Sequence, residues 1–264
     1  MASADLKKLF AERVTLAPGS TTWLQVRLSG RGFGDDQMVA LGRFLTTLLG
    51  GKSESAPSGG GEVCANVELA ENAIGSTGLM AVLDALEKNH VSCKCLKLFK
   101  NKIGDEGGFR LARVVANQAT AVEELHLSHN ALTQRSLVAL CMAIGKHDAY
   151  PQLGRNRLYI PCWLRMEYNH ISRPLEVVEV LRRDGEVSIC TAENREECGP
   201  WRCSHAGRTT RGVPKVHLFT ISVQSRNHRP GIQDDAELRE DIRRWGGRAV
   251  APSMRLPASR QPLG

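Results

Sequence analysis

An asparagine recurs at a fixed interval in this chain, and each copy ends the same short phrase. Asn72, Asn101 and Asn130 are 29 residues apart, and Asn169 follows after 39 residues. The phrases occupy residues 67–72, 96–101, 125–130 and 164–169. Two apolar residues stand five and three positions before each asparagine, as expected of a short strand with one buried face. A period in the twenties with this pattern is typical of proteins built from stacked repeat units.

Each unit is predicted to contain a strand, a turn and a helix. An apolar residue comes two positions after each asparagine, and apolar residues at helical spacing follow it. In the first full unit these helix residues are Leu79, Val82, Leu83 and Leu86. One unit cannot bury its strand and helix residues by itself. At least about three units must therefore stack to close a shared core.

The repeated asparagines have a structural interpretation. A carboxamide side chain carries both donors and an acceptor, and at the end of a strand it can satisfy backbone groups of the adjacent turn. We expect Asn72, Asn101, Asn130 and Asn169 to form a ladder that holds the turns in place. They are not expected to form a catalytic set.

The unit length and the Asn-Lys-Ile-Gly-Asp-Glu-Gly sequence of residues 101–107 resemble the ribonuclease-inhibitor-like class of leucine-rich repeats. NOD-like receptors and the Ran GTPase-activating protein contain repeats of this class. The resemblance covers residues 21–183. It implies an α/β leucine-rich repeat solenoid, a short horseshoe arc with parallel strands on the concave side and helices on the convex side.

Changes in composition and spacing divide the chain into four predicted parts. Residues 1–20 form an N-terminal helix or cap, and residues 21–183 form about five repeat units. Linker insertions lie near residues 46–62 and 145–159. The other parts are a cysteine-rich cap at residues 184–224, with strands at 186–190 and 216–223, and a basic, mostly disordered tail at 225–264, with a helix-like segment at 234–245.

Charge and hydropathy narrow the class of protein. The net charge of the chain is +7, and residues 205–264 supply +6 of it, from 11 Lys and Arg against 5 Asp and Glu. No run approaches the roughly 18 apolar residues of a membrane-spanning helix, and the first residues carry charge where a signal peptide would be apolar. We expect no membrane contact and a cytoplasmic location, with the nucleus as the alternative. The eight cysteines are then expected to be reduced thiols.

Four potential metal ligands lie close together in the predicted cap: Cys190, Cys198, Cys203 and His205. Thiolate and imidazole groups bind zinc in tetrahedral sites. The single residue between Cys203 and His205 makes it awkward for both to bind one ion. Two interpretations stay open, a zinc site or the packing of unligated thiols within the cap. Apart from this zinc, no cofactor is expected.

The predicted concave face carries mixed charges and aromatic rings. Side chains alternate between the two faces of a strand, so residues between and after the apolar strand positions should point away from the core. The candidates for a concave binding face are Arg27, Glu68, Lys97, Phe99, His126, His129, Arg165, Glu167 and Tyr168. Aromatic and arginine side chains often anchor protein interfaces. The alternative is a solvated sheet surface with no ligand.

The sequence favours a non-enzymatic scaffold that binds a protein partner through this face, and we expect a monomer. No Ser/His/Asp set or carboxylate pair stands out as catalytic. A second hypothesis is association with nucleic acid through the basic tail and the candidate zinc loop, because cations bind phosphates without sequence preference. A third, which rests on the resemblance alone, is regulation of a GTPase.

Overall fold

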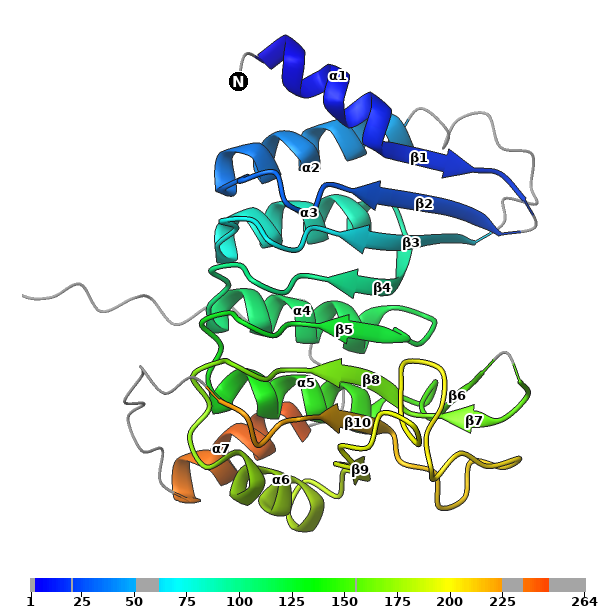
Figure 1. Cartoon of the computed structure of the whole chain (residues 1–264), viewed down its shortest axis with the longest axis vertical. Helices are drawn as coiled ribbons and strands as arrows, with labels where there is room; N and C mark the ends of the chain where they lie inside the picture. Colours follow the sequence, from blue (N-terminus) through cyan, green and yellow to red (C-terminus); the bar gives the residue numbers. More distant parts are fainter. Residues whose placement is uncertain (1–2, 20, 51–61, 155, 225–234, 247–264) are drawn as a thin grey trace, which may run out of the picture.

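The computed structural model describes residues 3–19, 21–50, 62–154, 156–224 and 235–246. The helices are α1 (Ser3–Arg13), α2 (Asp35–Gly50), α3 (Ser76–Lys88), α4 (Asp105–Asn117), α5 (Gln134–Lys146), α6 (Pro174–Arg183) and α7 (Asp235–Gly246). The strands are β1 (Val14–Ala17), β2 (Thr22–Arg27), β3 (Val63–Glu68), β4 (Val91–Lys97), β5 (Glu124–His126), β6 (Gln152–Leu153), β7 (Tyr159–Ile160), β8 (Cys162–Arg165), β9 (Ile189–Cys190) and β10 (Val216–Phe219). The described residues thus form a mixed α/β fold in which strands and helices alternate (Figure 1).

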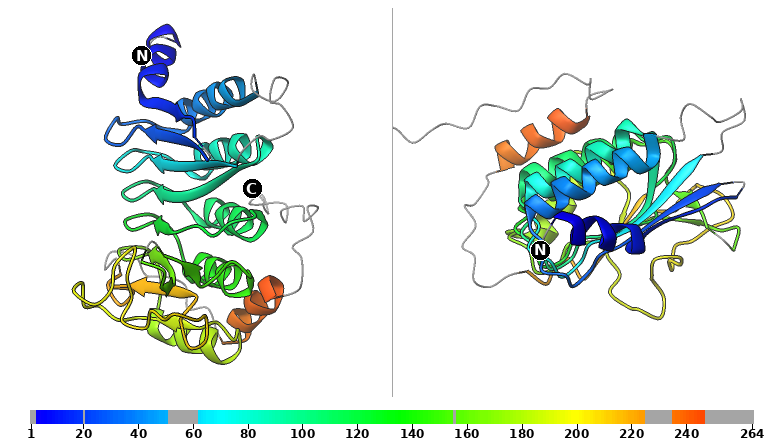
Figure 2. Two further views of the ribbon diagram at one scale, coloured as in Figure 1. Left: turned by 90° about the vertical axis from the view of Figure 1, so that its right-hand side faces the viewer. Right: turned by 90° about the horizontal axis from the view of Figure 1, so that it is seen from above.

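One sheet runs the length of the molecule in the order β1-β2-β3-β4-β5-β8-β10-β9. Its strands are parallel except β1, which pairs with β2 in the antiparallel direction. Helices α2, α3, α4 and α5 stack on one face of this sheet (Figure 2). The opposite face carries no stacked helix among the described residues, and we call it the open face.

The core lies between the sheet and the helix layer. The apolar strand residues of each unit, such as Leu96 and Leu98, are fully buried against helix residues such as Leu111 and Val115. Successive helices approach closely at their first turns. There, the backbone N–H of Gly75 donates to Asp35 at 2.6 Å, and Asp105 accepts from the Thr133 hydroxyl at 2.6 Å.

The asparagine side chains join neighbouring units. Asn130 accepts from the backbone N–H of Ile103 at 3.0 Å and donates to the carbonyls of Leu98 and Leu127 at 2.9 and 3.1 Å. The same pattern repeats in the other three units, where Asn72, Asn101 and Asn169 accept from Phe33, Ile74 and Leu132. Each side chain therefore closes its own turn and binds the backbone of the preceding unit.

The segment at 184–224 extends the sheet rather than lying across its end. The late strand β10 is inserted between β8 and β9, and it pairs in parallel with both. The two strands are shorter than the sequence indicated, because β9 and β10 span two and four residues. The loop between them lies over the open face (Figure 2).

One predicted boundary needs correction. The first linker was placed from residue 46, but α2 continues through Gly50 and residues 51–61 lie outside the described structure. The helix-like segment predicted at 234–245 agrees with α7, at residues 235–246, which buries Leu238 and Ile242. An ion pair between Asp241 and Arg135 of α5 fixes this helix further. The remaining tail residues, 225–234 and 247–264, are outside the described structure.

The second insertion, at 145–159, contains the end of α5 and a small hairpin of β6 and β7. Within the described residues, no helix combines the length and the apolar character needed to cross a membrane.

Candidate binding face and metal centre

The first row of open-face residues runs across five strands in register. Arg27, Glu68, Lys97, His126 and Arg165 are successive partners in neighbouring strands. Because these residues flank the buried apolar positions, strand alternation places them on the open face. Lys97 and Glu68 form an ion pair at 2.8 Å across two units. Charges in this half of the face thus neutralise each other.

A second row of side chains on the open face comes from the turns after the strands, where the backbone conformation repeats from unit to unit. The residue before each asparagine has a positive φ, between 53° and 57°, at Glu71, Lys100, His129 and Tyr168. The repeated left-handed conformation sets these side chains side by side. Lys100 pairs with Glu71 at 2.7 Å, and the ring of His129 stacks on that of Tyr168 with centroids 4.3 Å apart. Tyr168 remains 45% exposed.

Phe99 and His126 form a second aromatic stack, with ring centroids 4.3 Å apart. Burial, together with the nearby cations Arg165 and Lys97, lowers the pKa of His126 to about 3. The ring is therefore neutral near pH 7. It serves this face as an apolar ring rather than as a charge.

Glu167 corrects the expected set of outward-pointing residues. Its side chain was predicted to project from the concave face, but the residue is 2% exposed. Glu167 forms an ion pair with Arg165 and is covered by its neighbours. It therefore offers little surface for a partner to contact.

A cavity of about 500 Å³ lies where the loop after β9 crosses the open face. Its floor is the sheet, and its wall is the loop. The lining residues are Glu124, Trp163, Arg165, Arg195, Cys198, Gly199, Pro200, Trp201, Arg202 and Phe219. Trp201 is 55% exposed at the edge, and the guanidinium groups of Arg165 and Arg195 lie 5.7 and 5.3 Å from the ring centroid of Phe219. We call this the loop pocket.

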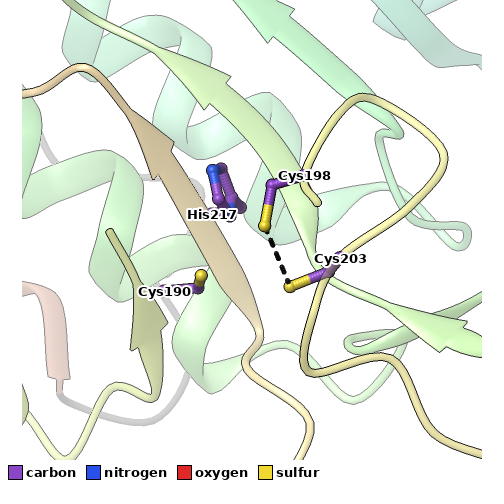
Figure 3. Close-up of side chains that lie close together, drawn as sticks. All are labelled: Cys190, Cys198, Cys203 and His217. Atoms are coloured by element: carbon purple, nitrogen blue, oxygen red, sulfur yellow. Dashed lines mark hydrogen bonds between the residues drawn. The ribbon is translucent and has the colours of Figure 1, made fainter. Parts of the chain in front are cut away.

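A cluster of metal-binding side chains lies next to the loop pocket. Ligand atoms of Cys190, Cys198, Cys203 and His217 all lie within 4.8 Å of one another (Figure 3). Cys190 of β9 and His217 of β10 are in-register partners on neighbouring strands. Cys198 and Cys203 come from the loop, where a bridge between Gly199 and Arg202 folds the chain into a tight turn.

His205 was the predicted fourth ligand, and this assignment is corrected. His205 is exposed, whereas His217 is buried and belongs to the cluster. The His205 ring nitrogen Nδ1 does approach the Cys203 sulfur, at 3.8 Å, but it lies on the outer side of the loop. Strand pairing instead brings His217, 12 residues further along the chain than His205, next to Cys190.

The thiols of the cluster interact. A hydrogen bond with Cys203 lowers the pKa of the Cys190 thiol far below its usual range, and the same contact raises the pKa of Cys203. Backbone N–H groups of Ser204 and His205 donate to the sulfurs of Cys198 and Cys203, each at 3.4 Å. The surroundings of the Cys190 sulfur therefore favour its negatively charged form, whereas those of Cys203 favour the neutral thiol.

Sequence reasoning missed His217 and the pocket residues Trp163, Trp201 and Phe219. A signal for two of them was present. In the stretch around Leu218, alternation with the buried Val216 and Leu218 puts His217 and Phe219 on the open face. Trp163 occupies the same face of β8, and its ring stacks on that of His217 at 4.6 Å.

The comparisons with known proteins identify the repeats. The family described as Leucine Rich repeat matches residues 94–112 and 119–141, which cover β4 to α5 with gaps. No curated protein matches the chain.

Proposed function

We propose that this chain, which contains leucine-rich repeats, is a non-enzymatic scaffold that binds a protein partner through the open face of its sheet. Proteins with such repeats are generally interaction modules. In this proposal the repeats form a short horseshoe arc of the ribonuclease-inhibitor-like class, and the open face is its concave side. The observation that carries the proposal is the loop pocket at one end of this face, which is lined by arginine and aromatic side chains and has Trp201 exposed at its edge.

The two ends of the open face differ in their chemistry. Toward the N-terminus, Lys97 and Lys100 pair with Glu68 and Glu71 of the preceding unit, so the charges are satisfied within the protein. Exposed ion pairs of this kind contribute little free energy. We therefore do not expect them to attract a partner unless the partner replaces one of the paired groups. Toward the C-terminus, the loop pocket combines three arginines with three aromatic rings, and its lining has one carboxylate, Glu124.

This composition favours a particular class of partner. Trp and Arg are enriched among residues that dominate protein interfaces, and a concave site can exclude water around them. The partner we propose presents an apolar side chain to Trp201 and acidic side chains to Arg195 and Arg202. Tyr168, on the second row, lies on the same open face and would extend the contact toward the turns.

Affinity capture with matched variants tests the proposal. The wild-type chain, a Tyr168→Ala/Trp201→Ala variant and a Lys88→Ala/Leu175→Ala control are used to capture proteins from lysate. The control removes an exposed charge and an exposed apolar side chain from the helices, and Leu175 is 53% exposed, close to Trp201 at 55%. Circular dichroism verifies that all three fold equally.

We expect a partner that wild type and the control retain and that the Tyr168→Ala/Trp201→Ala variant loses by at least about tenfold, the effect of 1.4 kcal/mol. Equal recovery from both variants would contradict binding through the open face. Recovery lost in the control alone would assign the interaction to the helix side.

A further inference from the structure

We propose that Cys190, Cys198, Cys203 and His217 bind one zinc ion, which holds the loop between β9 and β10 against the open face. Four protein ligands of these types leave no open coordination position, so the site is structural rather than catalytic. The inference is independent of the proposed function, because it concerns the metal content of the protein itself.

The geometry of the cluster suits a tetrahedral ion. A zinc–sulfur bond of about 2.3 Å places two sulfur ligands of one ion about 3.8 Å apart. The sulfurs of Cys198 and Cys203 are 4.0 Å apart, and the other ligand atoms lie within 4.8 Å of them (Figure 3). Small side-chain rotations therefore bring all four atoms to bonding distance.

His217 provides a second and independent observation. The residue is 1% exposed, and within the described structure neither ring nitrogen has a hydrogen bond of ordinary geometry, although the Cys190 thiol lies close enough to interact with the ring. A buried polar group without a well-formed hydrogen bond destabilises a fold. Trp163 stacks on one side of the ring, with planes 12° apart. A metal bond to one nitrogen would satisfy the imidazole that this packing holds in place.

The loop supplies the contacts expected around thiolate ligands. The backbone N–H groups of Ser204 and His205 point at the sulfurs of Cys198 and Cys203. Donors of this kind orient metal ligands and stabilise their charge. When zinc binds, each of the three thiols releases its proton to solvent and forms a zinc–sulfur bond.

A disulfide between Cys198 and Cys203 explains less of the site. It would require the two sulfurs to approach to about 2.0 Å, and it would leave Cys190 and His217 together without a partner. Zinc uses all four side chains and joins two neighbouring strands to the loop. The wall of the loop pocket, including Trp201, would then depend on the metal.

Metal analysis of the purified full-length chain tests the proposal. Zinc and protein are quantified after purification without a histidine tag and after removal of loosely bound metal. We expect about one zinc per chain in the wild type. His205→Ala and Cys95→Ser, which change a histidine and a thiol outside the cluster, should keep this stoichiometry. His217→Ala and Cys203→Ser should retain less than about a fifth of it.

Cobalt binding gives a readout on the wild type alone, in case the ligand variants fail to fold. The protein is stripped of metal, reduced and titrated with Co²⁺. A tetrahedral thiolate site should give intense ligand-field bands with sulfur-to-cobalt charge-transfer bands, and Zn²⁺ should abolish both. Wild type that takes up neither ion would overturn the proposal. Full zinc occupancy in His217→Ala, with loss in His205→Ala, would overturn the ligand assignment.

Discussion

The side-chain oxygen of Asn130 accepts a hydrogen bond from the backbone N–H of Ile103, in the preceding repeat unit, at 3.0 Å. The residue is buried, and its amide nitrogen donates to the carbonyls of Leu98 and Leu127. Asn130→Ala leaves these backbone groups without partners, so we expect a loss of about 3 kcal/mol in the free energy of unfolding. Denaturant unfolding monitored by circular dichroism measures it.

Asn72→Ala is the matched comparison for Asn130→Ala. Asn72 makes equivalent bonds but is only half-buried, so water can replace part of them. Its substitution should cost about 1 kcal/mol. If Asn72→Ala cost as much as Asn130→Ala, burial of the ladder would not determine its strength.

Gly78 of α3 lies where this helix approaches α2 closely. A Cβ atom at this position would stand 2.5 Å from Oδ1 and 2.9 Å from Cα of Asp35 in α2. Because the Cα atom belongs to the backbone, the helices must move apart. Gly78→Ala should therefore destabilise the protein by about 1–3 kcal/mol, as measured by the denaturation midpoint. Gly50→Ala, where a Cβ meets no atom within 4 Å, should leave stability unchanged or slightly higher.

Lys100 has a φ of 53°, in the left-handed region that a β-branched residue adopts poorly. Lys100→Gly and Lys100→Val both remove the exposed ion pair with Glu71. The loss of this ion pair therefore does not contribute to the difference in stability between the two variants. We expect the glycine variant to be more stable than the valine variant by at least about 1 kcal/mol. Thermal unfolding at one pH and salt concentration compares them, and equal stabilities would show that the turn relaxes at no cost.

His126 should make stability depend on pH. Its ordinary pKa of 6.5 applies in the unfolded chain, whereas burial and the nearby cations Arg165 and Lys97 lower the folded value to about 3. Between these values the unfolded chain binds the extra proton, so the free energy of unfolding falls as the pH falls. The contribution is full above pH 6.5 and decreases toward pH 3. His126→Gln should lose less stability than wild type between pH 7 and pH 4, in denaturant titrations. Parallel curves for the two proteins would contradict the assignment.

The repeated asparagines made the α/β repeat fold predictable, because each one marks the position of a turn that has the same geometry in every unit. The strand positions followed from the apolar residues beside them, as with Leu96 and Leu98. The sequence did not indicate that β10 enters the sheet between β8 and β9. That strand order depends on long-range pairing between Val216 and Cys162, which local sequence patterns do not reveal.

The candidate site was predictable in part for the same reason. Cys190, Cys198 and Cys203 stand close together in the sequence, so their association was expected. His217 comes to them only through its pairing with Cys190 across the sheet. Glu167 is buried although strand alternation predicts exposure, because this position lies two residues beyond the end of β8, where the regular strand pattern no longer holds.

Site-specific photo-crosslinking tests whether the partner binds through the open face. A photoreactive residue is placed at Tyr168 or Trp201 on the open face, and at Leu175 on α6 as the control, and the captured proteins are identified after irradiation. All three positions are exposed to a similar extent. We expect one partner to crosslink from both Tyr168 and Trp201 and not from Leu175. A partner crosslinked from Leu175 and from neither open-face position would contradict it.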